Sequence, residues 1–99
     1  MSKLISVTHL KNRYESPWEI LISESDKGEQ FFEDVTGNQY FLQMKPKHEV
    51  CEWLNGHSKH WYYGLTYPHN SVDDWIAKFY IIEEELVTLF LLRWSDKFE

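Results

Sequence analysis

The sequence predicts an α+β fold: a small, mostly antiparallel sheet, one principal helix packed on it and a C-terminal β-hairpin. Several short segments are rich in β-branched and aromatic residues, which fit a pleated, half-buried surface. One stretch, residues 46–55, carries apolar residues at helical spacing. The length of 99 residues predicts a single domain over residues 1–99.

Four to six strands are expected. Five segments before the C-terminal quarter share strand character: Lys3–Leu10, Trp18–Ser23, Phe31–Val35, Tyr40–Met44 and Trp61–Tyr67. Residues 29–35 also fit two turns of helix. A hairpin through the turn Thr36-Gly37-Asn38 would join the third segment to the fourth, because Gly supplies positive φ at little cost.

The best helix candidate begins at Pro46 and ends at Asn55. Proline suits the first helical position, where its missing N–H has no intrahelical partner. Val50, Trp53 and Leu54 fall at i, i+3 and i+4 and form one apolar stripe. Asn55 followed by glycine is typical of a helix end.

The closing hairpin is predicted from strands Trp75–Ile82 and Leu86–Ser95, joined by the acidic turn Glu83-Glu84-Glu85. Neither strand has a polar face until its end, and such two-sided apolar strands are usually central. One helix is not expected to cover both faces, so a homodimer partner, a client protein or the connecting segments would supply the rest. A helix over residues 72–94 is the competing interpretation, because part of this run fits a 3.6-residue period.

The same quarter of the chain ends in an aromatic residue, one spacer and Leu-Arg-Trp. The residues concerned are Phe79, Tyr80, Thr88, Phe90, Leu92, Arg93 and Trp94. In these residues it resembles the ends of small uncharacterised proteins of tailed bacteriophages, departing from them at the turn, where Glu83-Glu84-Glu85 replaces an Asp-Pro type. The resemblance implies a phage or prophage protein that acts on a host or phage factor, and it brings no catalytic residue.

Composition excludes some classes of function. The formal net charge is −6, and ten Lys and Arg residues are scattered along the chain, which disfavours direct nucleic-acid binding. Cys51 is the sole cysteine, so an intramolecular disulfide is impossible, as suits a reducing compartment. The longest apolar run, Leu89–Leu92, is too short to span a bilayer. We expect a cytoplasmic protein, in the host cytoplasm if it comes from a phage.

A metal site is an alternative reading of His48, Cys51, His57 and His60, which lie within 13 residues. Zinc accepts imidazole and thiolate ligands, although structural sites usually carry at least two cysteines. A core thiol with surface histidines explains the same residues. A catalytic triad of Cys51, a histidine and Asp73 rests on composition alone. No glycine-rich loop is present, so a nucleotide phosphate site is unsupported. We expect no cofactor.

The aromatic segment Trp61-Tyr62-Tyr63 is the best interaction candidate, because Trp and Tyr dominate binding hot spots. Strand alternation lets Trp61 and Tyr63 enter the core while Tyr62 stays outside. An aromatic core that uses all three rings internally is the competing explanation. Acidic side chains would support binding: Asp73, Asp74, Glu83, Glu84 and Glu85.

The sequence therefore predicts a non-enzymatic protein-interaction module of phage or prophage type. It would bind and inhibit a host protein, which could be basic or nucleic-acid-binding, and a homodimer stays open. The alternatives are a metal-stabilised small protein, a toxin-neutralising immunity protein and an acidic mimic of DNA. Mimicry needs charges spaced like phosphates over a long surface, for which a net charge of −6 is small.

Overall fold

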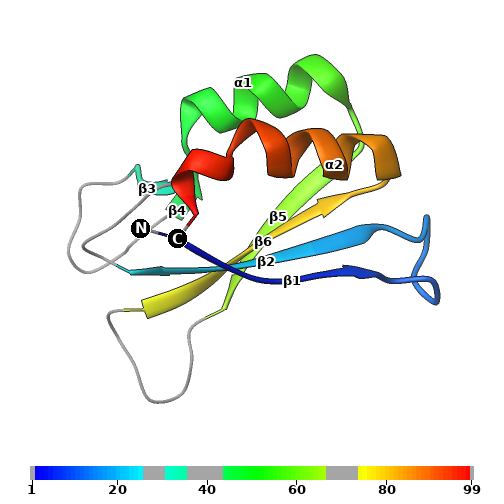
Figure 1. Ribbon diagram of the computed structural model, residues 1–99, viewed down its shortest axis with the longest axis horizontal. Coiled ribbons are helices and arrows are strands. Elements are labelled where there is room, and N and C mark those ends of the chain that lie inside the picture. The colour runs from blue at the N-terminus through cyan, green and yellow to red at the C-terminus, as the bar shows by residue number, and fades with distance from the viewer. Residues whose placement is uncertain (1, 26–30, 36–43, 67–73, 99) are drawn as a thin grey trace.

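The computed structural model describes residues 2–25, 31–35, 44–66 and 74–98 (Figure 1). The fold is α+β and mostly antiparallel, as predicted. In chain order its elements are β1 (Lys3–His9), β2 (Trp18–Ser25), β3 (Phe32–Asp34), β4 (Met44–Pro46), α1 (His48–His57), β5 (Trp61–Thr66), β6 (Asp74–Ile81), α2 (Glu84–Arg93) and the 3₁₀ helix η1 (Ser95–Lys97).

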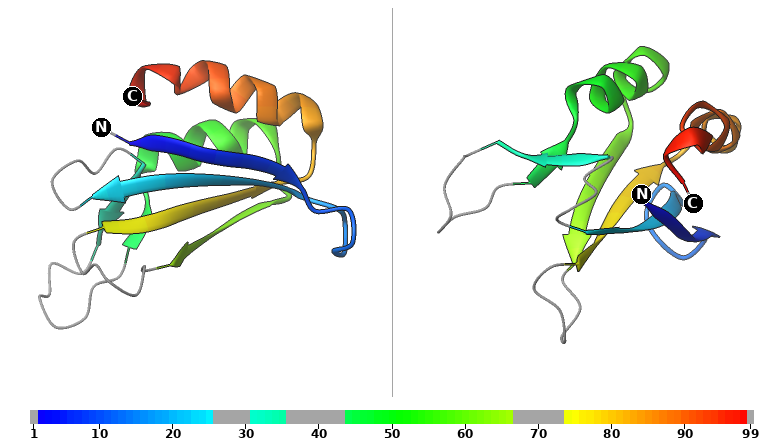
Figure 2. Two further views of the ribbon diagram at one scale, coloured as in Figure 1. Left: turned by 60° about the horizontal axis from the view of Figure 1, so that its bottom comes forward. Right: turned by 60° about the vertical axis from the view of Figure 1, so that its left-hand side comes forward.

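Within the described residues the main sheet has four strands in the order β1-β2-β6-β5, and every neighbouring pair is antiparallel. Strands β3 and β4 form a second, two-stranded sheet. Helices α1 and α2 lie side by side over the same face of the main sheet (Figures 1 and 2). Neither helix covers the opposite face, which we call the open face.

The core lies between the sheet and the two helices. Alternation along the central strands places Ile20 opposite Phe79 and Ile22 opposite Ala77, and all four side chains are buried. The helices bury their own apolar residues against this layer: Val50, Leu54, Leu86, Val87 and Phe90. Strand β6 is central, as its two-sided apolar sequence predicts.

The C-terminal hairpin prediction is wrong in its second half. Strand β6 forms, but the residues expected to return as a strand form helix α2. Leu86, Phe90 and Trp94 are buried at i, i+4 and i+8, which is one helical face. Leu89 and Leu92 stay exposed and give the run its two-sided apolar character. The expectation of one principal helix is therefore corrected to two α-helices within the described residues.

The predicted helix at residues 46–55 is confirmed as α1, displaced by two residues at each end. Pro46 does not open the helix, because it pairs with Phe32 at the end of β4. Asn55 and Gly56 do not end it either, and the Ser58 N–H closes the last turn on the Leu54 carbonyl at 2.8 Å.

The strand predictions near residues 3–10, 18–23 and 61–67 are confirmed as β1, β2 and β5. The predicted pairing after Phe31 is confirmed in part, because β3 pairs with β4, which begins at Met44. Its turn at residues 36–38 lies outside the described residues. In the described part of the chain, no helix is long and apolar enough to cross a membrane.

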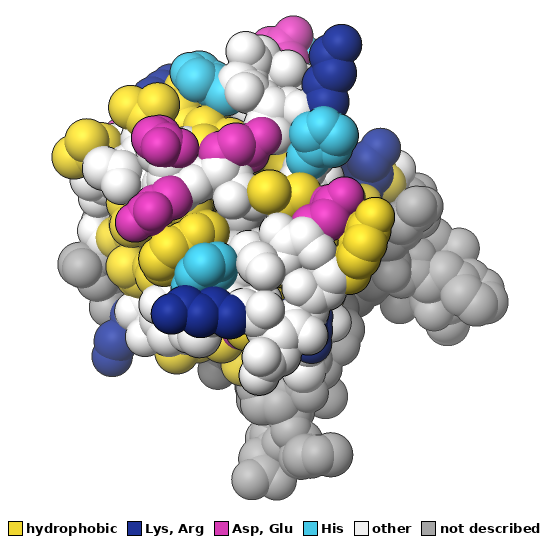
Figure 3. All heavy atoms as spheres, turned by 90° about the vertical axis from the view of Figure 1, so that its right-hand side faces the viewer, with side chains coloured by type: hydrophobic (Ala, Val, Ile, Leu, Met, Phe, Trp, Pro, Cys, Tyr) yellow, Lys and Arg dark blue, Asp and Glu magenta, His cyan; other side chains and the backbone are white. Residues whose placement is uncertain are grey.

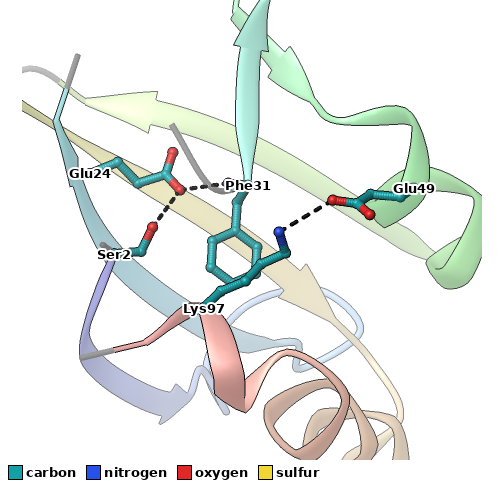
Figure 4. Close-up of polar contacts among 5 residues, drawn as sticks. All are labelled: Ser2, Glu24, Phe31, Glu49 and Lys97. Carbon is teal, nitrogen blue, oxygen red and sulfur yellow. Dashed lines mark hydrogen bonds and ion pairs between the residues drawn. The ribbon is translucent and has the colours of Figure 1, made fainter. Parts of the chain in front are cut away.

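The two ends of the described chain lie side by side, with the Ser2 N–H donating to the Lys97 carbonyl at 3.2 Å, and Ser2 also contacts the buried carboxylate of Glu24 (Figure 4). Glu24 Oε1 accepts hydrogen bonds from the Ser2 hydroxyl at 2.9 Å and the Phe31 N–H at 2.8 Å. Its other oxygen accepts one from Trp75 Nε1 at 3.2 Å. Nearby, Lys97 Nζ lies 3.2 Å from Glu49 and joins η1 to α1.

Candidate protein-binding surface

Two tyrosines stack on the open face of the sheet. Tyr62 of β5 lies directly opposite Tyr80 of β6, so their side chains leave the sheet on the same side. The ring centroids are 4.6 Å apart and the planes differ by 15°. Tyr62 is 46% exposed and Tyr80 only 7%, so Tyr62 presents the accessible surface of the pair.

Two charged residues hold the inner tyrosine in place. The Tyr80 hydroxyl donates to Glu19 Oε2 at 3.0 Å, and the Arg13 guanidinium lies 5.9 Å from the Tyr80 ring centroid. Burial, helped by the Glu19 carboxylate and opposed by Arg13, raises the pKa of Tyr80. The phenol therefore stays protonated at neutral pH and remains a donor. Arg13, Glu19, Tyr62 and Tyr80 together are the tyrosine cluster.

Trp61 and Tyr63 lie on the other side of β5, as alternation predicts. Trp61 is half-buried against the core, and its Nε1 donates to Asn55 Oδ1 at 2.8 Å. The Tyr63 ring packs edge-on against Phe32, with centroids 5.5 Å apart, and is 40% exposed. The structure therefore does not bring the three aromatic candidates onto one surface.

The acidic candidates also separate. Glu83, half-buried before the first turn of α2, accepts from the Ser58 hydroxyl at 3.0 and 3.1 Å and so joins the end of α1 to the start of α2. Glu84 and Glu85 are exposed in the first turn of α2. Asp73 lies outside the described residues, and the Asp74 side chain is not described either. Figure 3 shows acidic side chains gathered at the end of the molecule where α2 begins, with histidines among them.

The four residues of the metal alternative have other partners or stay exposed. His48 pairs with Glu52 at 3.1 Å, the Cys51 thiol donates to the Pro46 carbonyl at 3.5 Å, and His57 Nδ1 lies 2.8 Å from the Trp53 carbonyl. Within the described ranges, no three His, Cys, Asp or Glu residues are grouped to hold a metal ion. Burial raises the pKa of the Cys51 thiol, which disfavours the thiolate that a ligand or nucleophile needs.

Sequence reasoning missed the neighbours of Tyr62. Alternation along β6 places Tyr80 on the face opposite to that of Phe79. Alternation along β2 likewise places Glu19 on the face opposite to that of Ile20. The face on which Tyr80 and Glu19 lie could therefore be predicted from the sequence, but the fact that they lie next to each other on neighbouring strands could not. Arg13 stands in the loop between β1 and β2, where no periodic signal exists.

No family model matches this chain, and neither a curated protein nor a solved structure matches it. The residues that resemble tailed-phage proteins lie mostly in α2 rather than in a second strand. The resemblance therefore stays a prediction drawn from residue identity.

Proposed function

We propose that the protein is a non-enzymatic protein-binding module and that its docking surface is the open face around the tyrosine cluster. One observation carries the proposal: a half-exposed tyrosine, Tyr62, stands on a tyrosine that is already buried and hydrogen-bonded. The cluster draws on four elements: the loop before β2, the neighbouring strands β2 and β6, and the edge strand β5.

Pre-organisation is what suits this cluster to binding. Immobilising a flexible side chain on binding costs about 0.5–1.5 kcal/mol, and a ring already held by stacking avoids part of that cost. Tyrosine also joins a large apolar area to a hydroxyl that can donate or accept, as interface hot spots do. Around the cluster, Leu21 and Lys78 face each other as half-buried neighbours on the same face. They would extend the contact beyond the rings.

The charge of the molecule supports a basic partner surface. Glu84 and Glu85 are exposed at the end where β6 leads into α2, and Tyr62 pairs with Tyr80 near that end of β6. A formal net charge of −6 attracts positively charged partners and speeds their encounter. Together with the resemblance to tailed-phage proteins, this supports a host protein in the bacterial cytoplasm as the target, bound and inhibited by the module.

Affinity capture from bacterial lysate with tagged protein, followed by mass spectrometry, tests the proposal. Wild-type protein is expected to retain one host protein in stoichiometric amount. Tyr62→Ala is expected to lower retention at least tenfold, because truncating a hot-spot residue costs about 2 kcal/mol or more. Glu84→Lys is also expected to lower retention of the partner, and the loss should be larger at low salt than at high salt, because salt screens exposed charges.

Two control variants change similar groups away from this surface. Leu92→Ala removes an exposed apolar side chain from α2, and Asp96→Lys reverses an exposed charge in η1. Both are expected to retain the partner as wild-type protein does. Equal retention by wild-type, Tyr62→Ala and Glu84→Lys proteins would refute the proposed surface. A captured toxin would instead favour the immunity-protein alternative.

A further inference from the structure

The two edge strands of the main sheet differ in the features that would prevent another strand from pairing with them. Strand β1 has a bulge between Leu4 and Ser6, begins with the charged Lys3, and is preceded by Ser2, which bridges to Phe98. Bulges and edge charges are the usual devices that prevent strand-to-strand association. Strand β5 pairs with β6 in unbroken register over six residues and contains no charge and no proline. Within the described residues, no other backbone hydrogen bond reaches β5.

Among the described residues, nothing requires a glycine at position 64 in the middle of β5. A Cβ there would meet none of their atoms within 4 Å, and the Gly64 backbone is not in the left-handed region. Glycine weakens the interior of a strand and often marks a place where another group approaches closely. The side chain two residues earlier, Tyr62, lies on the same face and is half exposed.

Pairing of β5 with β5 of a second copy would explain both the unprotected edge of this strand and the glycine at position 64. In an antiparallel pair, residues directly opposite each other share a face. When a strand pairs with a second copy of itself, the two-fold axis must therefore pass midway between the two copies of one residue. An axis at Tyr63 places Tyr62 of each copy opposite Gly64 of the other, and Trp61 opposite Leu65. One face of the Tyr62 ring is stacked on Tyr80, and its other face then lies next to the partner's glycine. Such a pairing stabilises glycine-containing edge strands.

We propose that two copies of this chain associate through β5, antiparallel, with the two-fold axis at Tyr63. The two four-stranded sheets become one continuous sheet, and no charged side chains of β5 face each other. Because opposed residues share a face, both open faces lie on the same side of the dimer. The proposal goes beyond partner binding, since it concerns the purified protein alone.

Sedimentation velocity across about 1–100 µM protein tests the association, in a range typical of weak to moderate dimers. Wild-type protein is expected to sediment with twice the mass of the chain at the upper end. Gly64→Val is expected to be monomeric there, because its side chain occupies the space of the partner's ring. At about 1 µM, where the dimer contributes least to stability, its unfolding midpoint is expected to be unchanged or higher than that of wild-type protein, since valine suits a strand better than glycine. A monomeric wild-type protein, or a Gly64→Val dimer as tight as wild type, would overturn the proposal.

Cysteine cross-linking then tests the register in a Cys51→Ser background. Tyr63→Cys places two thiols directly opposite each other across the axis, at a Cα separation that a disulfide can span. Gly64→Cys places them off the axis. Oxidation is expected to give a covalent dimer of Tyr63→Cys and little of Gly64→Cys. The reverse pattern, or no cross-link in either variant, contradicts this dimer and leaves the result of partner capture unaffected.

Discussion

Glu24→Ala is expected to lower the free energy of unfolding by about 3 kcal/mol or more, since each buried donor left without a partner costs about 1–3 kcal/mol. The carboxylate is 2% exposed and accepts hydrogen bonds from Ser2, Phe31 and Trp75. These donors come from the first residues of the chain, the segment before β3 and the central strand. Removing the acceptor therefore loosens three parts of the fold at once.

Urea unfolding followed by tryptophan fluorescence measures the loss, which corresponds to roughly 12–24 °C in the thermal midpoint of a domain of this size. Glu24→Gln keeps the volume but turns an amide toward the donors, so an intermediate cost is expected. Glu49→Ala is the matched control, because it removes a partly exposed carboxylate whose pair with Lys97 contributes at most about 1 kcal/mol. A loss no larger for Glu24→Ala than for Glu49→Ala would contradict the role assigned to Glu24.

Phe31→Ala is expected to cost about 3–5 kcal/mol, the range for removing a buried aromatic ring. The side chain is fully buried, and its ring centroid lies 5.3–6.4 Å from those of Phe79, Phe90, Trp94 and Phe98. This ring therefore joins the sheet to α2 and to the last residues of the chain. Truncating it opens a cavity at the centre of the aromatic core.

The same unfolding measurement applies, with Val35→Ala as the control from the other end of this segment. Val35 is 47% exposed, so its truncation is expected to change stability by no more than about 0.5 kcal/mol. Phe31→Leu is expected to fall between the two, because leucine refills part of the cavity. Equal effects of Phe31→Ala and Val35→Ala would show that Phe31 does not hold the core.

Much of the main sheet could be predicted because its strands alternate between the core and the open face. Alternation assigns Ile20, Ile22 and Phe79 to the core and separates Tyr62 from Trp61 and Tyr63, and the structure agrees. Helix α1 was predictable because its apolar residues form one narrow stripe. In both cases burial on one side alone leaves a period in the sequence.

Helix α2 could not be predicted with the same ease, because apolar residues surround it. Leu89 and Leu92 are exposed beside the buried Leu86 and Phe90, so the run fits a strand and a helix alike. The tyrosine cluster was missed for a different reason. It depends on strand order, which pairs β6 with both β2 and β5, and local periodicity carries no information about order.

The central claim, that the open face around the tyrosine cluster binds a partner, is tested most directly by amide hydrogen exchange. The wild-type protein would be measured by mass spectrometry at one concentration, alone and saturated with the captured partner. We expect exchange to slow in β5 and around Tyr80 in β6, since protection follows the contacted segment. Exchange should stay unchanged in α1 and in the C-terminal half of α2. Slowing confined to the two helices, with β5 unchanged, would contradict the claim and place the binding surface on the opposite side of the molecule.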